Sequence, residues 1–290
     1  MSRSATRFVA EVSSNHNRDL GRCLAFIDAA ANAGCDAVKF QLFRVDELFA
    51  PEIVASDPEI AARRDWELPV EFIPELAKRC RDTGLEFSCT PFHLEAVDQL
   101  RDHVAFFKIA SYELLWDELL ERCAATGVPV VLSTGMATLD EVQAAVEVLQ
   151  GAGCRDLSLL HCVSRYPTQI DECNLAAMDT LRRACGVPVG WSDHSVNPLV
   201  IQRAVHRYEA CMVEFHFDLD GTGREYASRH CWLPWQIAPV IRDVRESLRA
   251  DGSPIKEPHP AELEERDWRA DPSDGLRPFL HVRRAAAGNA

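Results

Sequence analysis

The chain has 290 residues, 47% of them hydrophobic and 26% charged, a composition typical of globular proteins. Its formal net charge of −14 argues against nucleic acids and anionic membrane surfaces as partners. No apolar run approaches the roughly 20 residues of a membrane helix, and the first residues lack the apolar core of a signal peptide. We therefore expect a cytoplasmic protein with no membrane or nucleic-acid partner.

The 11 cysteines are scattered through apparent core segments. Their number is odd and none forms a CxxC pair, whereas disulfide frameworks and zinc sites use regular spacings. We therefore interpret them as reduced residues that fill the core as small hydrophobes.

Eight short apolar segments recur along the chain and are predicted to be strands. They are residues 8–13, 36–41, 86–90, 106–111, 128–135, 157–163, 187–194 and 212–217. Helical periodicity fills most of the intervals between them. Two examples are Leu20, Leu24, Ile27 and Ala31, and Val142, Ala145, Val146 and Leu149. Glycines that typically end helices precede five of the strands, namely Gly34, Gly84, Gly127, Gly153 and Gly186.

Strands that alternate with helices predict a parallel sheet, and about eight such units in roughly 250 residues match an α/β fold of the (β/α)8 TIM-barrel type. A doubly wound open sheet is the alternative, but its GxGxxG turn is absent after the first strand, where the chain has NHNRDLG. We assign residues 1–252 to the barrel. Residues 253–290, rich in proline and charge, are predicted to be an irregular C-terminal arm without a second folded domain, frayed over 283–290.

Polar residues near the carboxyl ends of the predicted strands are unexpected, because strands buried on both faces should be apolar throughout. These residues are Glu11, Lys39, Gln41, Thr90, Lys108, Ser111, Ser133, Thr134, His161, Ser164, Ser192, Asp193, His194, Glu214 and His216. In a barrel all these ends meet at one rim, which is where barrel enzymes have their active sites.

Two pairs of these residues indicate particular ligands. Buried lysines are rare, so Lys39 and Lys108 predict a site for an anion. His194 and His216 are either ordinary hydrogen-bonded histidines or, with Glu214, an open site for a divalent ion. The serines and threonines are also compatible with simple capping of the next helix. The last strand, in MVEFHFDLD (212–220), alternates strictly, so Glu214 and His216 face either water or an active site.

Several longer segments occur in one order along residues 7–240. They are AEVSSNHNRDL (10–20), AGCDAVKFQLF (33–43), FSCTPF (87–92), FKIASYEL (107–114), VVLSTGMATLDEV (130–142), LLHCVSRYPT (159–168), VPVGWSDHS (187–195) and VEFHFDLD (213–220). Together they resemble the sialic acid synthase (N-acetylneuraminate synthase-like, NeuB) family. The resemblance implies a barrel that condenses phosphoenolpyruvate with an amino-sugar aldehyde to a nonulosonic 2-keto acid plus phosphate, using Mn²⁺ or Mg²⁺.

On matching positions, the resemblance implies that His194 and His216 are the metal ligands. It implies that phosphoenolpyruvate is bound by Lys39, Thr90, Lys108, Ser111 and Ser192, and that the reaction space is lined by Glu11, Gln41, Tyr166 and Glu214. A carboxylate is expected to orient the attacking water, with Glu214 as the first candidate and Glu11 as the second. Lys39 and Lys108 would neutralise the phosphate and the carboxylate of the substrate.

The sequence departs from the family on the sugar side. Arg18 and Arg165 replace a glycine and an asparagine, and Phe215 replaces a lysine. We place Arg165 among the substrate-binding residues, with Glu225 as the nearest counterpart of a sugar-binding aspartate; arginines at the rim would suit an anionic sugar.

The family's C-terminal antifreeze-like domain is expected to have no counterpart here. Members of the family commonly form homodimers, so the resemblance implies a homodimer as a possible partner state. Two alternatives remain for the function. One is another phosphoenolpyruvate or pyruvate barrel enzyme, such as an aldolase or a keto-acid phosphate synthase. The other is a catalytically idle barrel that binds a sugar acid.

Overall fold

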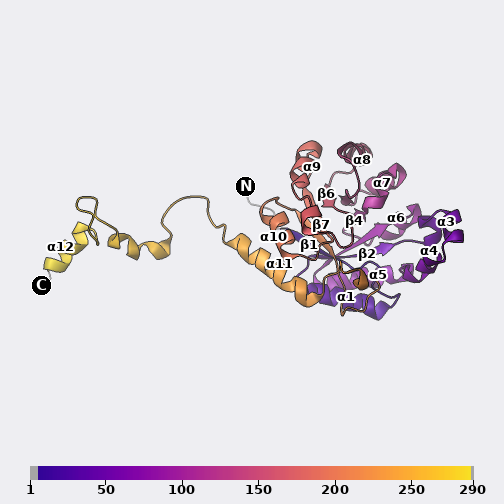
Figure 1. Ribbon diagram of the computed structural model, residues 1–290, viewed down its shortest axis with the longest axis horizontal. Helices are drawn as coiled ribbons and strands as arrows, with labels where there is room; N and C mark the ends of the chain where they lie inside the picture. The colour runs from indigo at the N-terminus through magenta and orange to yellow at the C-terminus, as the bar shows by residue number, and fades with distance from the viewer. Residues whose placement is uncertain (1–5, 289–290) are drawn as a thin grey trace. The chain divides into compact units, whose positions relative to one another are not determined.

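The computed structural model describes residues 6–288, and its first compact unit, which ends at Leu248, contains a closed barrel. Eight parallel strands follow one another around the barrel in chain order, and the eighth pairs with the first (Figure 1). They are β1 (Arg7–Glu11), β2 (Ala37–Leu42), β3 (Glu86–Pro91), β4 (Phe106–Ile109), β5 (Val130–Ser133), β6 (Leu157–Cys162), β7 (Val189–Asp193) and β8 (Met212–His216). The predicted (β/α)8 barrel is confirmed, and each strand ends within two residues of its predicted limits.

Helices surround this barrel on its outer side (Figure 1). In this first unit they are α1 (Leu20–Ala33), α2 (Val45–Leu48), α3 (Pro51–Ser56), α4 (Pro58–Ala62), α5 (Ile73–Thr83), α6 (Leu94–Leu100), α7 (Asp117–Ala125), α8 (Leu139–Gly151), α9 (Ala177–Cys185), α10 (Pro198–His206) and α11 (Pro234–Arg249), whose last residue already belongs to the second unit. The left-handed residues Gly34, Gly84 and Gly186 end α1, α5 and α9, as predicted.

The predicted helix faces are right for α8 and shifted for α1. In α8 all four predicted residues are buried, and Thr138 and Glu141 form a capping box at its start. In α1 the buried face is formed by Cys23, Phe26, Ile27, Ala30 and Ala33, whereas three of the predicted residues, Leu20, Leu24 and Ala31, are only partly buried. The apolar character of α1 is broad, so periodicity alone did not place the centre of its buried stripe.

The inside of the barrel is built in layers. A small apolar cluster of six buried residues fills one level, and it consists of Val9, Ala37, Phe106, Val131, Leu160 and Met212. Residues two positions apart on a strand point to the same side. The next level therefore contains the residues two positions later on five of these strands, which are Glu11, Lys39, Lys108, Ser133 and Glu214. The barrel thus presents a layer of buried polar groups toward the carboxyl ends of its strands.

The second compact unit begins at Arg249 and has short helical turns at Pro260–Glu262 and Glu264–Trp268 before helix α12 (Leu280–Gly288). The carboxylate of Asp271 accepts a hydrogen bond from the backbone of Leu280 at 2.6 Å, at the start of this helix. Residues 280–288 are thus helical in the segment where a frayed tail is predicted, and residues 289–290 lie outside the described part.

Two expectations based on composition can be compared with the described residues. All eleven cysteines are free, and only Cys185 and Cys211 are not buried, in agreement with their interpretation as reduced core residues. Among residues 6–288, no helix combines the length and the apolar character that crossing a membrane requires.

Candidate active site

Two buried lysines lie in the polar layer of the barrel, Lys39 on β2 and Lys108 on β4, and each is 3% exposed. The register of β1 and β2 places Glu11 beside Lys39, and the two side chains form an ion pair. Glu214 on β8 lies between the lysines, with Oε1 3.4 Å from Lys108 Nζ and Oε2 4.0 Å from Lys39 Nζ. The structure therefore brings together all four residues predicted to be catalytic.

The charges of this quartet depend on one another. Burial by itself would raise the pKa of Glu214, but Lys108 and Lys39 outweigh burial and hold this pKa below its ordinary value. Burial would likewise lower the pKa of Lys39, but Glu11 and Glu214 raise it above the ordinary value. The pKa of Lys108 is lowered, because burial outweighs its attraction to Glu214. Lys108 is thus the more weakly compensated cation.

Three other predicted residues form hydrogen bonds with the quartet. Lys39 Nζ donates to Thr90 Oγ1 at 3.2 Å, Ser192 Oγ donates to Glu214 Oε1 at 3.3 Å, and Gln41 Nε2 donates to Glu11 Oε1 at 2.7 Å. Ser111, in the turn after β4, accepts from the backbone of Gly135 at 2.9 Å. A side-chain carbon at Gly135 would overlap the hydroxyls of Ser111 and Ser164, so these side chains would have to move.

Unpaired polar atoms concentrate in the same part of the barrel. The hydroxyls of Ser133 and Ser164 and the Oε2 atom of Glu214 are buried and have no hydrogen-bond partner. Buried polar atoms in proteins are nearly always paired, so unpaired atoms at one place need an explanation. A bound polar ligand would supply these partners.

The predicted metal ligands His194 and His216 lie beside each other, with ring centroids 5.3 Å apart. Nδ1 of His194 contacts the backbone oxygen of Val163 at 2.8 Å, and Nδ1 of His216 contacts Glu225 Oε2 at 2.9 Å. Both partners only accept, so the protons lie on the Nδ1 atoms and each Nε2 is left as a free acceptor. Tyr166 packs against His194 with ring centroids 4.2 Å apart.

Glu225 belongs to the loop that follows β8, residues 217–233, here called the β8 loop. Its carboxylate accepts from Ser13 Oγ at 2.5 Å as well as from His216, and its backbone nitrogen donates to Asn15 Oδ1 at 2.8 Å. Burial would raise the pKa of Glu225, but His216 and the hydrogen bonds outweigh it and lower the pKa. The structure thus places Glu225 against His216.

The two arginines that depart from the family pattern are engaged by protein groups. Arg165, with 60% of its side chain exposed, pairs with Glu172. Arg18 Nη1 donates to the backbone oxygen of Arg64 at 2.7 Å. In this structure neither guanidinium contacts the other predicted site residues, and the binding role of Arg165 stays a prediction.

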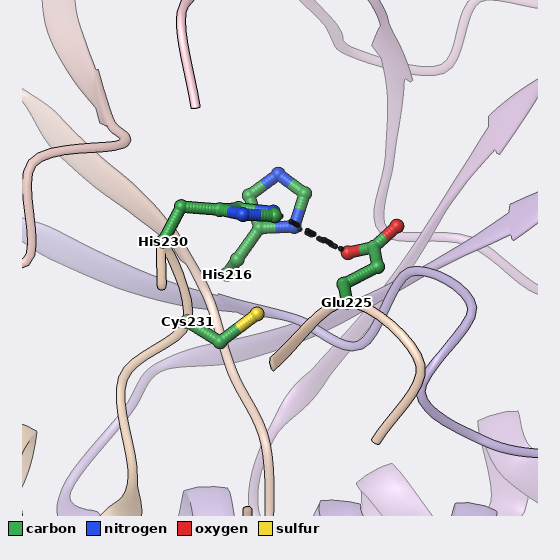
Figure 2. A group of neighbouring side chains, drawn as sticks. All are labelled: His216, Glu225, His230 and Cys231. Atoms are coloured by element: carbon green, nitrogen blue, oxygen red, sulfur yellow. Dashed lines mark hydrogen bonds and ion pairs between the residues drawn. The ribbon is translucent and has the colours of Figure 1, made fainter. Parts of the chain in front are cut away.

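Sequence reasoning missed three residues near this centre. Glu113 lies in the turn after β4, and burial raises its pKa to about 7, against the influence of Lys108. A carboxyl group that titrates near neutral pH is suited to proton transfer. His230 and Cys231, in the β8 loop, lie beside His216 and Glu225 (Figure 2). The adjacent pair His230–Cys231 was a visible signal, but it stands outside any strand.

The closed barrel and the buried polar centre at the carboxyl ends of its strands define a (β/α)8 protein with a site in the usual position for barrel enzymes. The chain belongs to the NeuB family, whose family model matches residues 26–256.

The chain is also similar to individual family members. It is 36% identical over 260 residues to an uncharacterized protein of Methanocaldococcus jannaschii, and the match covers 89% of this chain and 75% of the relative. It is 32% identical over 267 residues to the N,N'-diacetyllegionaminic acid synthase of Campylobacter jejuni, covering 87% and 79%. The crystal structure of N-acetylneuraminic acid (sialic acid) synthetase from Leptospira borgpetersenii superposes with a TM-score of 0.81 at 29% identity, covering 93% of both chains.

Proposed function

We propose that this protein condenses phosphoenolpyruvate with a sugar aldehyde to give a nonulosonic, sialic-acid-like 2-keto acid and phosphate. The observation that carries this proposal is the buried quartet of Lys39, Lys108, Glu11 and Glu214, in a layer that also contains the unpaired hydroxyl of Ser133. Relatives that are synthases of legionaminic and sialic acids support the class of reaction. The sugar itself remains part of the proposal.

The lysines suit the anionic substrate. A phosphate group carries about two negative charges near neutral pH, and the carboxylate of phosphoenolpyruvate adds another. Lys39 and Lys108 are the cations of the buried layer, and the hydroxyls of Thr90 and Ser192 lie within hydrogen-bond distance of the quartet. The substrate anions would replace Glu11 and Glu214 as partners of the lysines. Lys108 would change partners more readily, because its charge is compensated more weakly.

The carboxylates suit the reacting carbons. When C3 of phosphoenolpyruvate bonds to the aldehyde carbon, C2 becomes electron-poor, water adds to C2, and phosphate leaves with its bridging oxygen. Glu214 is held ionised by two lysines and has one unpaired oxygen, so it can orient this water and accept its proton. Glu11, fixed by Gln41 and Lys39, is the second candidate.

The residues also fit a divalent ion. The quartet is neutral in sum, so an entering trianion needs additional positive charge, and neutral imidazoles leave the charge of an ion undiminished. His194 and His216 both keep Nε2 free, and each is oriented through Nδ1, which is the arrangement usual for metal-binding histidines. When bound at these residues, Mn²⁺ or Mg²⁺ would supply a Lewis acid for the aldehyde.

The test is an assay of the purified chain with phosphoenolpyruvate and a panel of aldoses that includes N-acetylmannosamine. Aldose-dependent phosphate release in Mn²⁺, Mg²⁺ or Co²⁺, abolished by EDTA, is expected together with a 2-keto acid product detected by mass spectrometry. If no aldose stimulates phosphate release with any of these ions, the synthase proposal is wrong.

Lys108 supports one rival function. Because burial lowers its pKa, Lys108 could serve as the Schiff-base lysine of a pyruvate aldolase. Borohydride in the presence of pyruvate would then attach a covalent adduct to Lys108, seen as a mass increase of its peptide, and Lys108→Met would abolish it. Metal-dependent turnover without trapping favours the synthase.

A further inference from the structure

A cavity of about 150 Å³ lies at the carboxyl end of β2, and it is here called the β2 cavity. The residues that directly follow Gln41 in the chain line it, namely Leu42, Phe43 and Arg44. A strand rises about 3.3 Å per residue, so Phe43 lies roughly 13 Å beyond Lys39 along the direction of β2. The β2 cavity is therefore placed to receive a part of the substrate that extends away from the reacting carbons.

The wall of the β2 cavity combines apolar and hydrogen-bonding side chains. Its apolar members include Leu42, Phe43, Leu68 and Val70, and its polar members are Arg18, Arg44, Glu67 and Gln99. Ligand sites in proteins commonly have this composition, in which an apolar wall carries a few polar groups that fix the orientation of the ligand. The cavity is thus suited to a small group that has both an apolar part and hydrogen-bonding atoms.

Gln99, on α6, has an acceptor without a partner. Its Nε2 donates to Glu95 Oε1 at 2.8 Å, which fixes the orientation of the amide. Its Oε1 is buried and has no hydrogen-bond partner. Buried side-chain oxygens are nearly always paired in proteins, and an N–H group of a ligand in the cavity would supply the partner. Glu95 lies outside the cavity wall and contacts Gln99 through this nitrogen.

Arg18, in the loop after β1, supplies donors to the same cavity. Its Nη1 donates to the backbone oxygen of Arg64 at 2.7 Å, and this hydrogen bond uses one of the five N–H groups of a guanidinium. The backbone of Arg18 has a φ of 54°, in the left-handed region that favours glycine. Other residues in this conformation cluster at functional sites. The arginine that departs from the family pattern is therefore a candidate for contact with the substrate.

The charges around the cavity favour a neutral ligand over an anion. Arg44 Nη1 donates to Glu47 Oε1 at 2.8 Å and to Glu95 Oε2 at 2.7 Å. Glu67 adds a third carboxylate, in the cavity wall itself. Three carboxylates thus accompany the two guanidinium groups of Arg18 and Arg44, and a phosphate or carboxylate entering here would meet net negative charge.

We propose that the β2 cavity binds an acylamino group on a carbon of the aldose remote from the aldehyde, with Gln99 Oε1 accepting from its N–H and Arg18 donating to its carbonyl oxygen. The cavity of about 150 Å³ is several times larger than the roughly 30 Å³ that one water molecule occupies in the liquid. A hydroxyl group alone would not fill it, whereas an acylamino group also places its alkyl end against Leu68 and Val70. The inference rests on the proposed function, because it names the class of sugar that the same site accepts.

The test compares substrates of the full-length chain in the phosphate-release assay. They are N-acetylmannosamine, its derivatives with a second acetamido group at C4 or at C6, and its 6-phosphate. We expect the lowest KM for one of the two diacetamido sugars. Gln99→Leu and Arg18→Gly should each raise this KM about tenfold and leave the KM of N-acetylmannosamine and kcat unchanged. Glycine adopts a positive φ freely, so Arg18→Gly removes the side chain without backbone strain. The matched control is Gln150→Leu, whose side chain is exposed on α8.

A binding measurement separates this inference from the proposed function. Saturation-transfer NMR with the alditols of the same sugars reports binding without reaction, because an alditol has no aldehyde. Tighter binding of a diacetamido alditol that is lost in Gln99→Leu would support the cavity even if no aldose is turned over. Turnover with equal KM values for all the sugars, or a preference that persists in both variants, would overturn the inference and leave the synthase intact.

A preference for the 6-phosphate that is lost in Arg18→Gly would also overturn the inference, because it would assign an anion to the cavity. Circular dichroism of each variant checks that the barrel is folded.

Discussion

The polar layer of the barrel and the β8 loop place their functional groups by different means. Lys39, Lys108 and Glu214 stand on strands, and hydrogen-bonded register fixes their positions. Glu225 and His230 stand on a loop that is held by side-chain contacts and by the Phe217–Trp232 bridge. Substitutions in the layer should therefore affect turnover and folding together, whereas substitutions in the loop should change metal affinity in a folded barrel.

The largest expected effect is on turnover. Glu214→Gln keeps the size of the side chain but removes the negative charge between Lys39 and Lys108. We expect kcat for aldose-dependent phosphate release to fall by about 10²–10³-fold, the loss typical of removing one group that stabilises the transition state. The control is Glu95→Gln, whose exposed carboxylate pairs with Arg44 and Gln99. Turnover near the wild-type value in Glu214→Gln would remove Glu214 from the reaction.

The next-largest expected effect is on the unfolding free energy, and it tests whether the buried ion pair of Lys39 and Glu11 is needed for a stable fold. Lys39→Met leaves Glu11 buried without its cation, and removing one partner of a buried ion pair costs about 3–5 kcal/mol of unfolding free energy. Adding Glu11→Gln should recover part of this loss. Urea denaturation measures both variants, with Lys78→Met as the control, since the Lys78–Asp82 pair is exposed, screened by solvent and contributes little to stability. Equal losses in Lys39→Met and Lys78→Met would contradict the prediction.

Glu113, in the turn after β4, provides a pH-dependent test of stability. Burial raises its pKa from 4.5 to about 7, so the folded state favours the neutral carboxyl group. Its contribution to stability is full below about pH 4.5 and is lost as the pH rises through about 7. Glu113→Gln removes this loss. From pH 5 to pH 8, the unfolding free energy of the variant relative to wild type should rise by roughly 2–3 kcal/mol.

Urea melts of both proteins at the two pH values measure this change. A difference between variant and wild type that is the same at pH 5 and pH 8 would show that Glu113 does not titrate in this range.

The smallest expected effect is on metal affinity, and it concerns Glu225 in the β8 loop rather than a residue of the polar layer. Glu225→Gln weakens the hydrogen bond to His216 and removes a charge, so the affinity for a divalent ion should fall about 10–100-fold. Calorimetric titration with Mn²⁺ and Co²⁺ measures it. The unfolding free energy without metal should fall less than in Lys39→Met, because Glu225 is partly exposed and lies outside the strands. A large loss of stability would make the loop part of the folding core.

Much of the site was predictable because, in a barrel, the position of a residue along its strand determines how close it lies to the rim. Residues near the ends of eight parallel strands meet at one rim whatever the helices between them contain. Lys39, Lys108, Glu214, His194 and His216 could therefore be grouped before any distance was known. Arg165 shows the limit of this reasoning, since it follows β6 and yet its exposed side chain pairs with Glu172.

By itself, the sequence determined the eight strands, their order and the polar residues at their ends, because alternation and period are local properties of the chain. Only the tertiary structure decided which of these groups touch. That Glu214 lies between two lysines depends on closure of β8 against β1 and β7. That His230 and Cys231 lie beside His216 depends on a loop that folds back onto its own strand. Loop contacts of this kind are set by long-range hydrogen bonds, which leave no periodic pattern in the sequence.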